Sequence, residues 1–161
     1  MGHVLTLDQM RVERARQRAA GRRIVLTNGV FDILHVGHTR YLSQARALGD
    51  TLVVAVNDDD SVRALKGSER PILPLAERAE MLAALASVDY VISFSETTAA
   101  TVVATLEPDL YVKGGDYSSG KPLPEAAVVA AYGGEVHLLP FVPGRSTSDI
   151  IRAIRAHHTL A

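Results

Sequence analysis

Apolar residues along this chain gather in short aliphatic runs, separated by longer segments with helical spacing. The runs predict strands that are covered on both faces, at residues 23–28, 51–56, 88–93, 109–112 and 135–139. The segments between and after them predict helices, at residues 37–48, 74–85, 97–106, 124–132 and 146–156. This alternation indicates a doubly wound α/β fold, a Rossmann-like parallel sheet of five strands with helices on both faces. Ligands of such sheets bind beyond the carboxyl ends of the strands.

One more helix is predicted ahead of the first strand, over residues 7–20. Thr6 is placed to cap its start and Gly21 to end it. Residues 1–21 are therefore expected to form a leading helix, and residues 22–157 the α/β core. The mixed apolar and arginine pattern of the leading helix suits either packing on the domain or a contribution to a dimer.

The chain has 161 residues, and 47% of them are hydrophobic, which is enough for one continuous core. No repeat and no long linker divides residues 1–161, so a single domain is expected. The stretch of glycine, serine, lysine and proline over residues 118–124 is the candidate for a mobile loop. A homo-oligomer, a dimer or higher, is expected.

The formal net charge of −1 gives no electrostatic footprint for nucleic acid or for an anionic membrane. The absence of cysteine excludes disulfides, thiolate zinc sites and thiol nucleophiles, and it fits the cytoplasm. No basic stretch followed by an apolar one opens the chain, and no apolar run approaches the roughly 20 residues that span a bilayer. The expected partners are small molecules.

The segment TNGVFDILHVGHTRYL, which follows the first core strand, carries the strongest chemical signal. Asn28 and Gly29 allow main-chain N–H groups to approach a phosphate at the end of the strand. His35 and His38 flank Gly37 where the loop becomes a helix, and a helix N-terminus favours anions. Two imidazoles would add directional hydrogen-bond donors to that site.

Other interpretations of the two histidines remain open at this point. One could be a core residue and the other a surface residue. A zinc site would have only Asp32 nearby as a further ligand, with no cysteine in the chain, so its ligand set is incomplete. No GxxxxGK[ST] loop occurs, which disfavours a kinase or ATPase of the Walker type.

The block GVFDILHVGH resembles the HxGH signature of the nucleotidyltransferase superfamily, which includes glycerol-3-phosphate cytidylyltransferase, phosphopantetheine adenylyltransferase and the class I tRNA synthetases. The blocks KGSERP, KGGDY and GRSTSDII follow in that order, and they resemble the branch that makes ADP-heptose from D-glycero-D-manno-heptose 1-phosphate. The resemblance covers nearly everything after about Arg22. No sugar-kinase segment is attached, which predicts the stand-alone form of such an enzyme.

The resemblance implies roles for individual residues. Those implied in catalysis, by contact with phosphates, are His35, His38, Lys66 and Arg78. Those implied in nucleotide binding are Thr27, Asn28, Gly29, Val30, Phe31, Gly37, Asn57, Lys113, Gly114, Asp116, Ser146, Thr147 and Ser148. Those implied in binding of the acceptor substrate are Asp32, Lys66, Gly115 and Tyr117. No residue is assigned as a metal ligand.

The resemblance implies transfer of AMP from ATP to the heptose phosphate, with Mg²⁺ accompanying the triphosphate. Because one sequence does not distinguish adenine from cytosine contacts, a cytidylyltransferase for glycerol 3-phosphate or a related polyol phosphate is the alternative enzyme. A nucleotide-binding module without catalysis is the non-enzymatic alternative, since a fold alone does not establish a function.

Overall fold

The computed structural model of the chain describes residues 1–115, 123–140 and 146–158. Its centre is a six-stranded sheet with the order β1-β4-β3-β2-β5-β6 and parallel pairing throughout. The strands are β1 (His3–Val4), β2 (Ile24–Gly29), β3 (Thr51–Asn57), β4 (Tyr90–Phe94), β5 (Leu110–Gly114) and β6 (Glu135–Leu139).

The predicted fold class is confirmed, but the strand count differs from the prediction. The sixth strand is β1, two residues that pair with Tyr90 and Val91 at the edge of the sheet. Gly2 permits this approach, because a Cβ there would lie 2.5 Å from the carbonyl oxygen of Val88. A two-residue strand has no periodicity of its own, so the hydrophobic pattern could not reveal it.

The helices are α1 (Leu7–Ala19), α2 (Val36–Arg46), α3 (Asp59–Lys66), α4 (Leu75–Ala83), α5 (Ala100–Leu106), α6 (Ala126–Ala131) and α7 (Thr147–His158). Helix α3 was not predicted. Asp58 caps its start by accepting a hydrogen bond from the Ser61 amide, and Gly67 follows its last residue at φ 96°. Because α3 has only eight residues and begins with acidic ones, it has little apolar pattern to detect.

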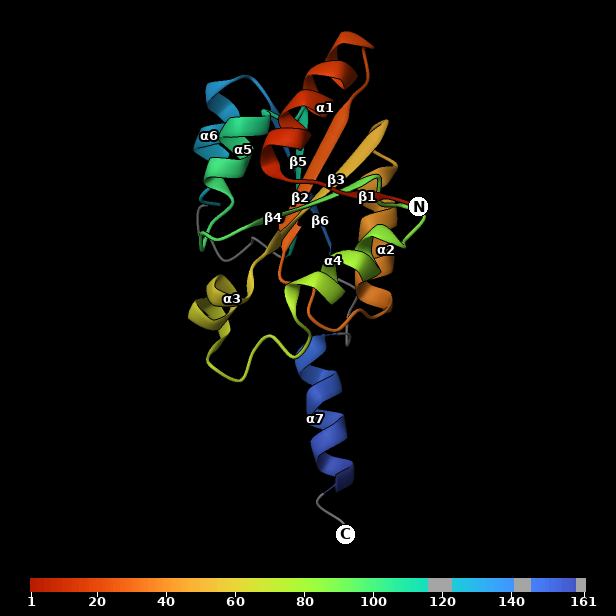
Figure 1. Cartoon of the computed structure of the whole chain (residues 1–161), viewed down its shortest axis with the longest axis vertical. Helices are drawn as coiled ribbons and strands as arrows, with labels where there is room; N and C mark the ends of the chain where they lie inside the picture. Colours follow the sequence, from red (N-terminus) through yellow and green to blue (C-terminus); the bar gives the residue numbers. More distant parts are fainter. Residues whose placement is uncertain (116–122, 141–145, 159–161) are drawn as a thin grey trace.

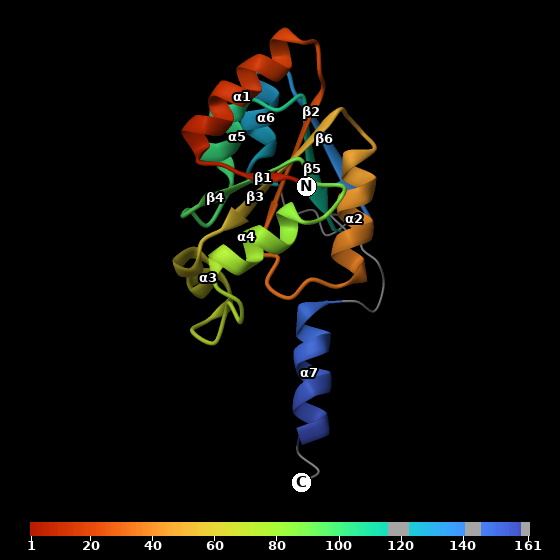
Figure 2. The ribbon, with the colours of Figure 1, turned by 45° about the vertical axis from the view of Figure 1, so that its right-hand side comes forward.

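Two hydrophobic clusters cover the two faces of the sheet (Figures 1 and 2). Helices α2 and α4 lie on one face, where Leu42 and Leu82 are fully buried against alternate residues of β2 and β3. Helices α1, α5 and α6 cover the opposite face. The strands therefore have apolar residues on both sides, which explains their continuous aliphatic runs.

The leading helix packs on the domain, which is one of the two uses that its pattern allowed. Thr6 and Gln9 form a capping box at its start. Met10 is fully buried in the cluster on that face. The guanidinium of Arg14 donates to the carbonyl oxygens of Leu106 and Glu107, so the helix is tied to the end of α5.

The order of the strands creates the place for a ligand. The chain runs from β2 to β3 and β4 on one side, and then crosses back to β5 and β6 on the other. In such sheets the carboxyl ends of the strands on either side of the reversal frame a crevice, here between β2 and β5. Helix α7 starts near this end of the sheet and extends away from the domain (Figures 1 and 2).

Candidate active site

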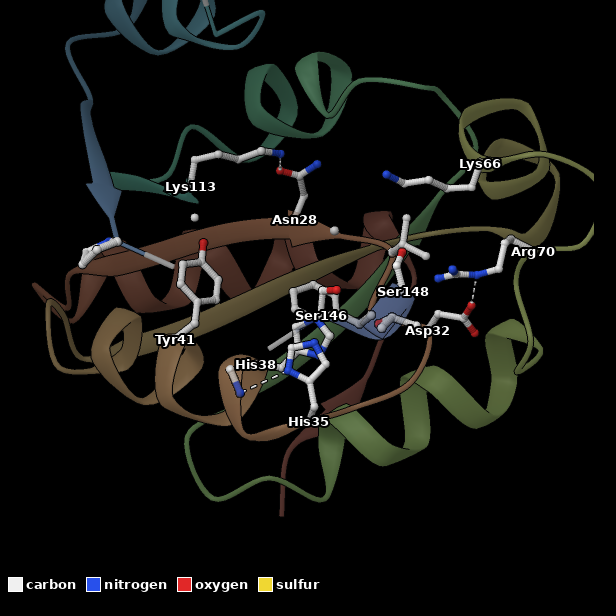
Figure 3. Close-up of a pocket in the computed structure, with 17 residues that line it drawn as sticks. Asn28, Asp32, His35, His38, Tyr41, Lys66, Arg70, Lys113, Ser146 and Ser148 are labelled. Atoms are coloured by element: carbon white, nitrogen blue, oxygen red, sulfur yellow. Dashed lines mark hydrogen bonds and ion pairs between the residues drawn. The ribbon is translucent and has the colours of Figure 1, made fainter. Parts of the chain in front are cut away.

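A cavity of about 460 Å³ opens at the carboxyl ends of β2 and β5 (Figure 3). It is lined by Asn28, Gly29, Val30, Phe31, Asp32, His35, Gly37, His38, Tyr41, Lys66, Arg70, Lys113, Gly114, Pro140, Ser146, Thr147 and Ser148. The structure thus gathers most of the residues that the sequence assigned to the site. They come from the β2–α2 loop, α3, the end of β5 and the start of α7.

His35 is the N-cap of α2. Its Nδ1 accepts a hydrogen bond of 3.1 Å from the backbone N–H of Gly37. A neutral imidazole has one acceptor and one donor nitrogen, so the neutral ring of His35 carries its proton on Nε2. The helix start thereby orients this ring and sets its tautomer.

His38 lies one turn further along α2, and its ring stacks on that of His35 with 3.9 Å between the centroids. The edge contact with Phe31, at 5.3 Å, closes another side of the ring. Burial, together with the charge of a protonated His35, lowers the pKa of His38 to about 4. His38 is therefore neutral at pH 7, and it acts as a polar hydrogen-bonding group and not as a cation.

Asn28 and Lys113 join the two strands at the crevice. The Oδ1 atom of Asn28 accepts hydrogen bonds of 2.6 Å from Lys113 Nζ and from the Tyr111 hydroxyl. Burial lowers the pKa of Lys113, while the charge of Glu125 opposes that shift. The ammonium group thus lies at the switch point, where it can meet an anion at the edge of the cavity.

Asp32 is bonded in a way that differs from its predicted contact with sugar hydroxyls. Its side chain is 1% exposed. Its two oxygens accept hydrogen bonds from the backbone amides of Ile72 and Leu73, at 2.8 to 3.0 Å, and from Arg70 Nε at 2.5 Å. Burial raises the pKa of this carboxyl, but those amides and Arg70 outweigh it and hold the pKa below its usual value. A carboxylate with these bonds has little capacity left for a sugar.

The two cationic side chains at the end of the cavity where Asp32 lies are Lys66 and Arg70 (Figure 3). Lys66 is the last residue of α3 and is exposed. Arg70 was missed by the sequence analysis, although it stands in the quoted block KGSERP, four residues after Lys66. Only the fold shows that both reach the same cavity.

Arg78 has a structural position, contrary to its assignment as a phosphate ligand. It is fully buried in α4 and is not among the cavity residues. Its guanidinium donates to the carbonyl oxygens of Leu73, Val30 and Asn57, and to the carboxylate of Asp59. These bonds join the loops that follow β2 and β3. Arg78 therefore supports the site from beneath and does not face it.

Thr27 and Asn57, both assigned to the nucleotide, are also buried outside the cavity. The Thr27 hydroxyl lies 2.6 Å from the hydroxyl of Tyr41, and the amide of Asn57 donates to Ser61 and to the carbonyl of Glu96. Both residues lie on strands, at positions whose side chains point into the packed interior. Tyr41 itself lines the cavity and was not predicted, because its helical position resembles an ordinary core residue.

Three further assignments lie at or beyond the edge of the described residues. Gly115 is not among the cavity residues, and its amide donates to the carbonyl of Leu139 at 3.0 Å. Asp116 and Tyr117 lie outside the described residues, as does most of the loop predicted to be mobile.

The start of α7 contributes hydroxyls to the cavity. Ser146 accepts from the Asp149 amide, which confirms the predicted cap, and its hydroxyl donates to the Asp149 carboxylate at 2.7 Å. Thr147 donates to the carbonyl of Ile33 at 3.3 Å, which connects this helix start to the loop before α2. Two helix N-termini, those of α2 and α7, therefore border the same cavity.

The described part of the chain contains no group of three or more histidine or carboxylate side chains that could hold a metal ion. Within the same residues, none of the helices is both long and apolar enough to cross a bilayer.

Comparison with protein families places the chain clearly. The family model described as cytidylyltransferase-like matches residues 26–153. Among curated proteins, the chain is 52% identical over 155 residues to the bifunctional protein HldE of Shewanella amazonensis, covering 96% of this chain and 32% of that protein. It is 55% identical over 139 residues to the protein of the same name from Halorhodospira halophila, covering 86% and 29%. The chain thus spans about a third of the length of these relatives.

Solved structures agree with this placement. A lipopolysaccharide core biosynthesis protein from Thermoplasma volcanium is 32% identical with a TM-score of 0.61, covering 76% of this chain and 98% of that one. A pantoate-beta-alanine ligase from Francisella tularensis is 13% identical with a TM-score of 0.62, covering 98% and 78%. At that identity the ligase supports the fold only.

Proposed function

The chain belongs to the cytidylyltransferase-like family, and from that premise we propose that it transfers a nucleoside monophosphate from an NTP to a sugar phosphate. The finer proposal is transfer of AMP from ATP to D-glycero-D-manno-heptose 1-phosphate, giving ADP-heptose and pyrophosphate. The observation that carries the proposal is the stacked pair of His35 and His38 at the start of α2, facing a cavity that also has Lys66 and Arg70.

The reaction needs no nucleophile from the protein. An oxygen of the sugar phosphate attacks the α-phosphorus, a new P–O bond forms, and the bond from the α-phosphorus to the bridging oxygen breaks, so that pyrophosphate leaves. The protein must hold two polyanions together and stabilise the charge on the transferring group. The helix start at His35, the neutral ring of His38 and the amides near Gly29 supply donors for that charge.

The histidines are not needed as bases. The acceptor phosphate is already ionised near neutral pH, and the pKa of His38, at about 4, makes its ring a weak base. The contribution of His35 and His38 is positioning and electrostatic. Loss of one such donor commonly lowers the rate by about 10²-fold.

We expect Mg²⁺ to enter with the triphosphate. The carboxylate in the cavity lining is Asp32, whose oxygens are bonded to amides and to Arg70, and the described residues offer no ligand cluster. The cation would therefore be held mainly by phosphate oxygens and water, and it would neutralise part of their charge. The homo-oligomer that the sequence suggests stays a prediction.

The test is release of pyrophosphate with ATP or CTP, each offered with heptose 1-phosphate, as either anomer, or with glycerol 3-phosphate. Release with ATP and heptose phosphate alone, slowed by about 10²-fold in His38→Ala, supports the proposal. Release only with CTP and glycerol 3-phosphate would replace it with the cytidylyltransferase, which the family description also allows. No release with any pair would favour a nucleotide-binding module.

A further inference from the structure

The guanidinium of Arg70 enters the cavity from the loop between α3 and α4 (Figure 3). Its side chain is 16% exposed, and its Nε donates to Asp32 Oδ2 at 2.5 Å. Among the described residues, the hydrogen bonds of Arg70 do not involve either terminal nitrogen. The planar guanidinium is therefore fixed through Nε, while its two terminal nitrogens are available to a ligand in the cavity.

Asp32 holds the guanidinium of Arg70 in place. It is buried in the turn after β2, and the amides of Ile72 and Leu73 also donate to its carboxylate. Four hydrogen bonds thus connect one carboxylate to the segment that contains Arg70. Because these bonds fix Asp32, Arg70 loses little further freedom when it binds a ligand.

The charges at this end of the cavity favour a phosphate. Lys66 and Arg70 both reach inward there, and Asp32 has its oxygens directed at the amides and Arg70 (Figure 3). A guanidinium with a free edge matches two phosphate oxygens at once, which an ammonium does not.

Resting on the proposed function, we propose that Arg70 is a phosphate-binding residue of this cavity and that Asp32 is the positioning residue that orients it. The phosphate is either that of the sugar phosphate or the β,γ-phosphates that leave as pyrophosphate. Both present the same chemistry to a guanidinium, and experiment distinguishes them.

The decisive variant is Arg70→Lys, which keeps the charge and removes the fork. Calorimetric titration with inorganic pyrophosphate and, separately, with inorganic phosphate measures binding without turnover. We expect binding of one of the two probes to weaken by about tenfold. A loss above fivefold with either probe supports the proposal and shows which phosphate is bound. Smaller changes with both probes, or a wild-type protein that binds neither, would overturn it.

The matched control is Arg63→Lys, on the exposed side of α3. Arg63 also pairs with a carboxylate, that of Asp60, but lies outside the cavity. It should bind both probes as the wild type does. These titrations do not depend on turnover, so absence of pyrophosphate release would count against the proposed function and leave the assignment of Arg70 standing on its own result.

The role of Asp32 is tested with Asp32→Asn alone and combined with Arg70→Lys, with Asp60→Asn as control. If Asp32 acts through Arg70, the double variant binds the affected probe within about twofold of Arg70→Lys alone. Losses that multiply would show that Asp32 acts independently. Melting temperatures are measured first, and if Asp32→Asn does not fold, Arg70→Lys alone still decides the proposal.

Discussion

The imidazole rings of His35 and His38 stack with 3.9 Å between their centroids and 23° between their planes. Burial and the neighbouring ring lower the pKa of His38 from 6.5 to about 4. Between these two values the unfolded chain binds the proton and the folded chain does not. His38 therefore contributes its full share of stability above pH 6.5, and loses it as the pH falls toward 4.

We predict that the free energy of unfolding of the wild type falls more steeply from pH 7 to pH 4 than that of His38→Asn. Over this range the wild type should lose at most about 3 kcal/mol more of its free energy of unfolding than His38→Asn does. Urea unfolding at pH 7, 6, 5 and 4 measures it. Parallel curves for wild type and His38→Asn would contradict the lowered pKa.

Arg78→Met is predicted to destabilise the protein, because the buried guanidinium bonds three carbonyl oxygens and the carboxylate of Asp59. Removing one member of a buried ion pair costs about 3 to 5 kcal/mol. Urea unfolding measures the loss, and titration with ATP at low temperature should show little change in affinity. Unchanged stability with at least tenfold weaker ATP binding would restore Arg78 as a phosphate ligand.

Lys66→Ala is predicted to lower activity with little loss of stability, which is the opposite of the prediction for Arg78→Met. Its side chain is exposed at the end of α3, so the free energy of unfolding should change by less than about 0.5 kcal/mol. Because Lys66 lines the cavity, kcat/KM for the transfer should fall by about 10²-fold. Arg63→Ala on the same helix is the matched control. Equal activities of the two variants would argue against a role for Lys66.

Asn28→Ala is predicted to weaken both stability and nucleotide binding. It removes the acceptor shared by Tyr111 and Lys113, and the loss of such an acceptor costs about 1 to 3 kcal/mol for each donor. Tyr111→Phe removes only one donor, and should cost about 1 kcal/mol. A cost for Asn28→Ala no larger than that for Tyr111→Phe, measured by urea unfolding, would show that Lys113 finds another partner.

The local features of this protein could be predicted from its sequence. The aliphatic runs determined five strands, because residues that are buried on both faces need no polar alternation. Thr6 and Gly21 marked the leading helix, and the spacing of His35 and His38 around Gly37 put both rings at a helix start. Each of these conclusions depends on neighbours within a few residues, which the sequence displays directly.

The tertiary structure alone decided which charged residues face the cavity. Arg70 and Arg78 are eight residues apart and chemically identical, yet one lines the cavity and the other is fully buried. Likewise, the sequence predicted that Asp32 contacts a sugar, whereas the structure shows its carboxylate bonded to Arg70. The hydrogen-bond partner of Asp32 is Ile72, and those of Arg78 include Asn57 and Asp59. These residues lie on separate segments that meet only when the parallel strands align. Burial and hydrogen-bond partners depend on those distant contacts, and for that reason no local pattern could assign these side chains.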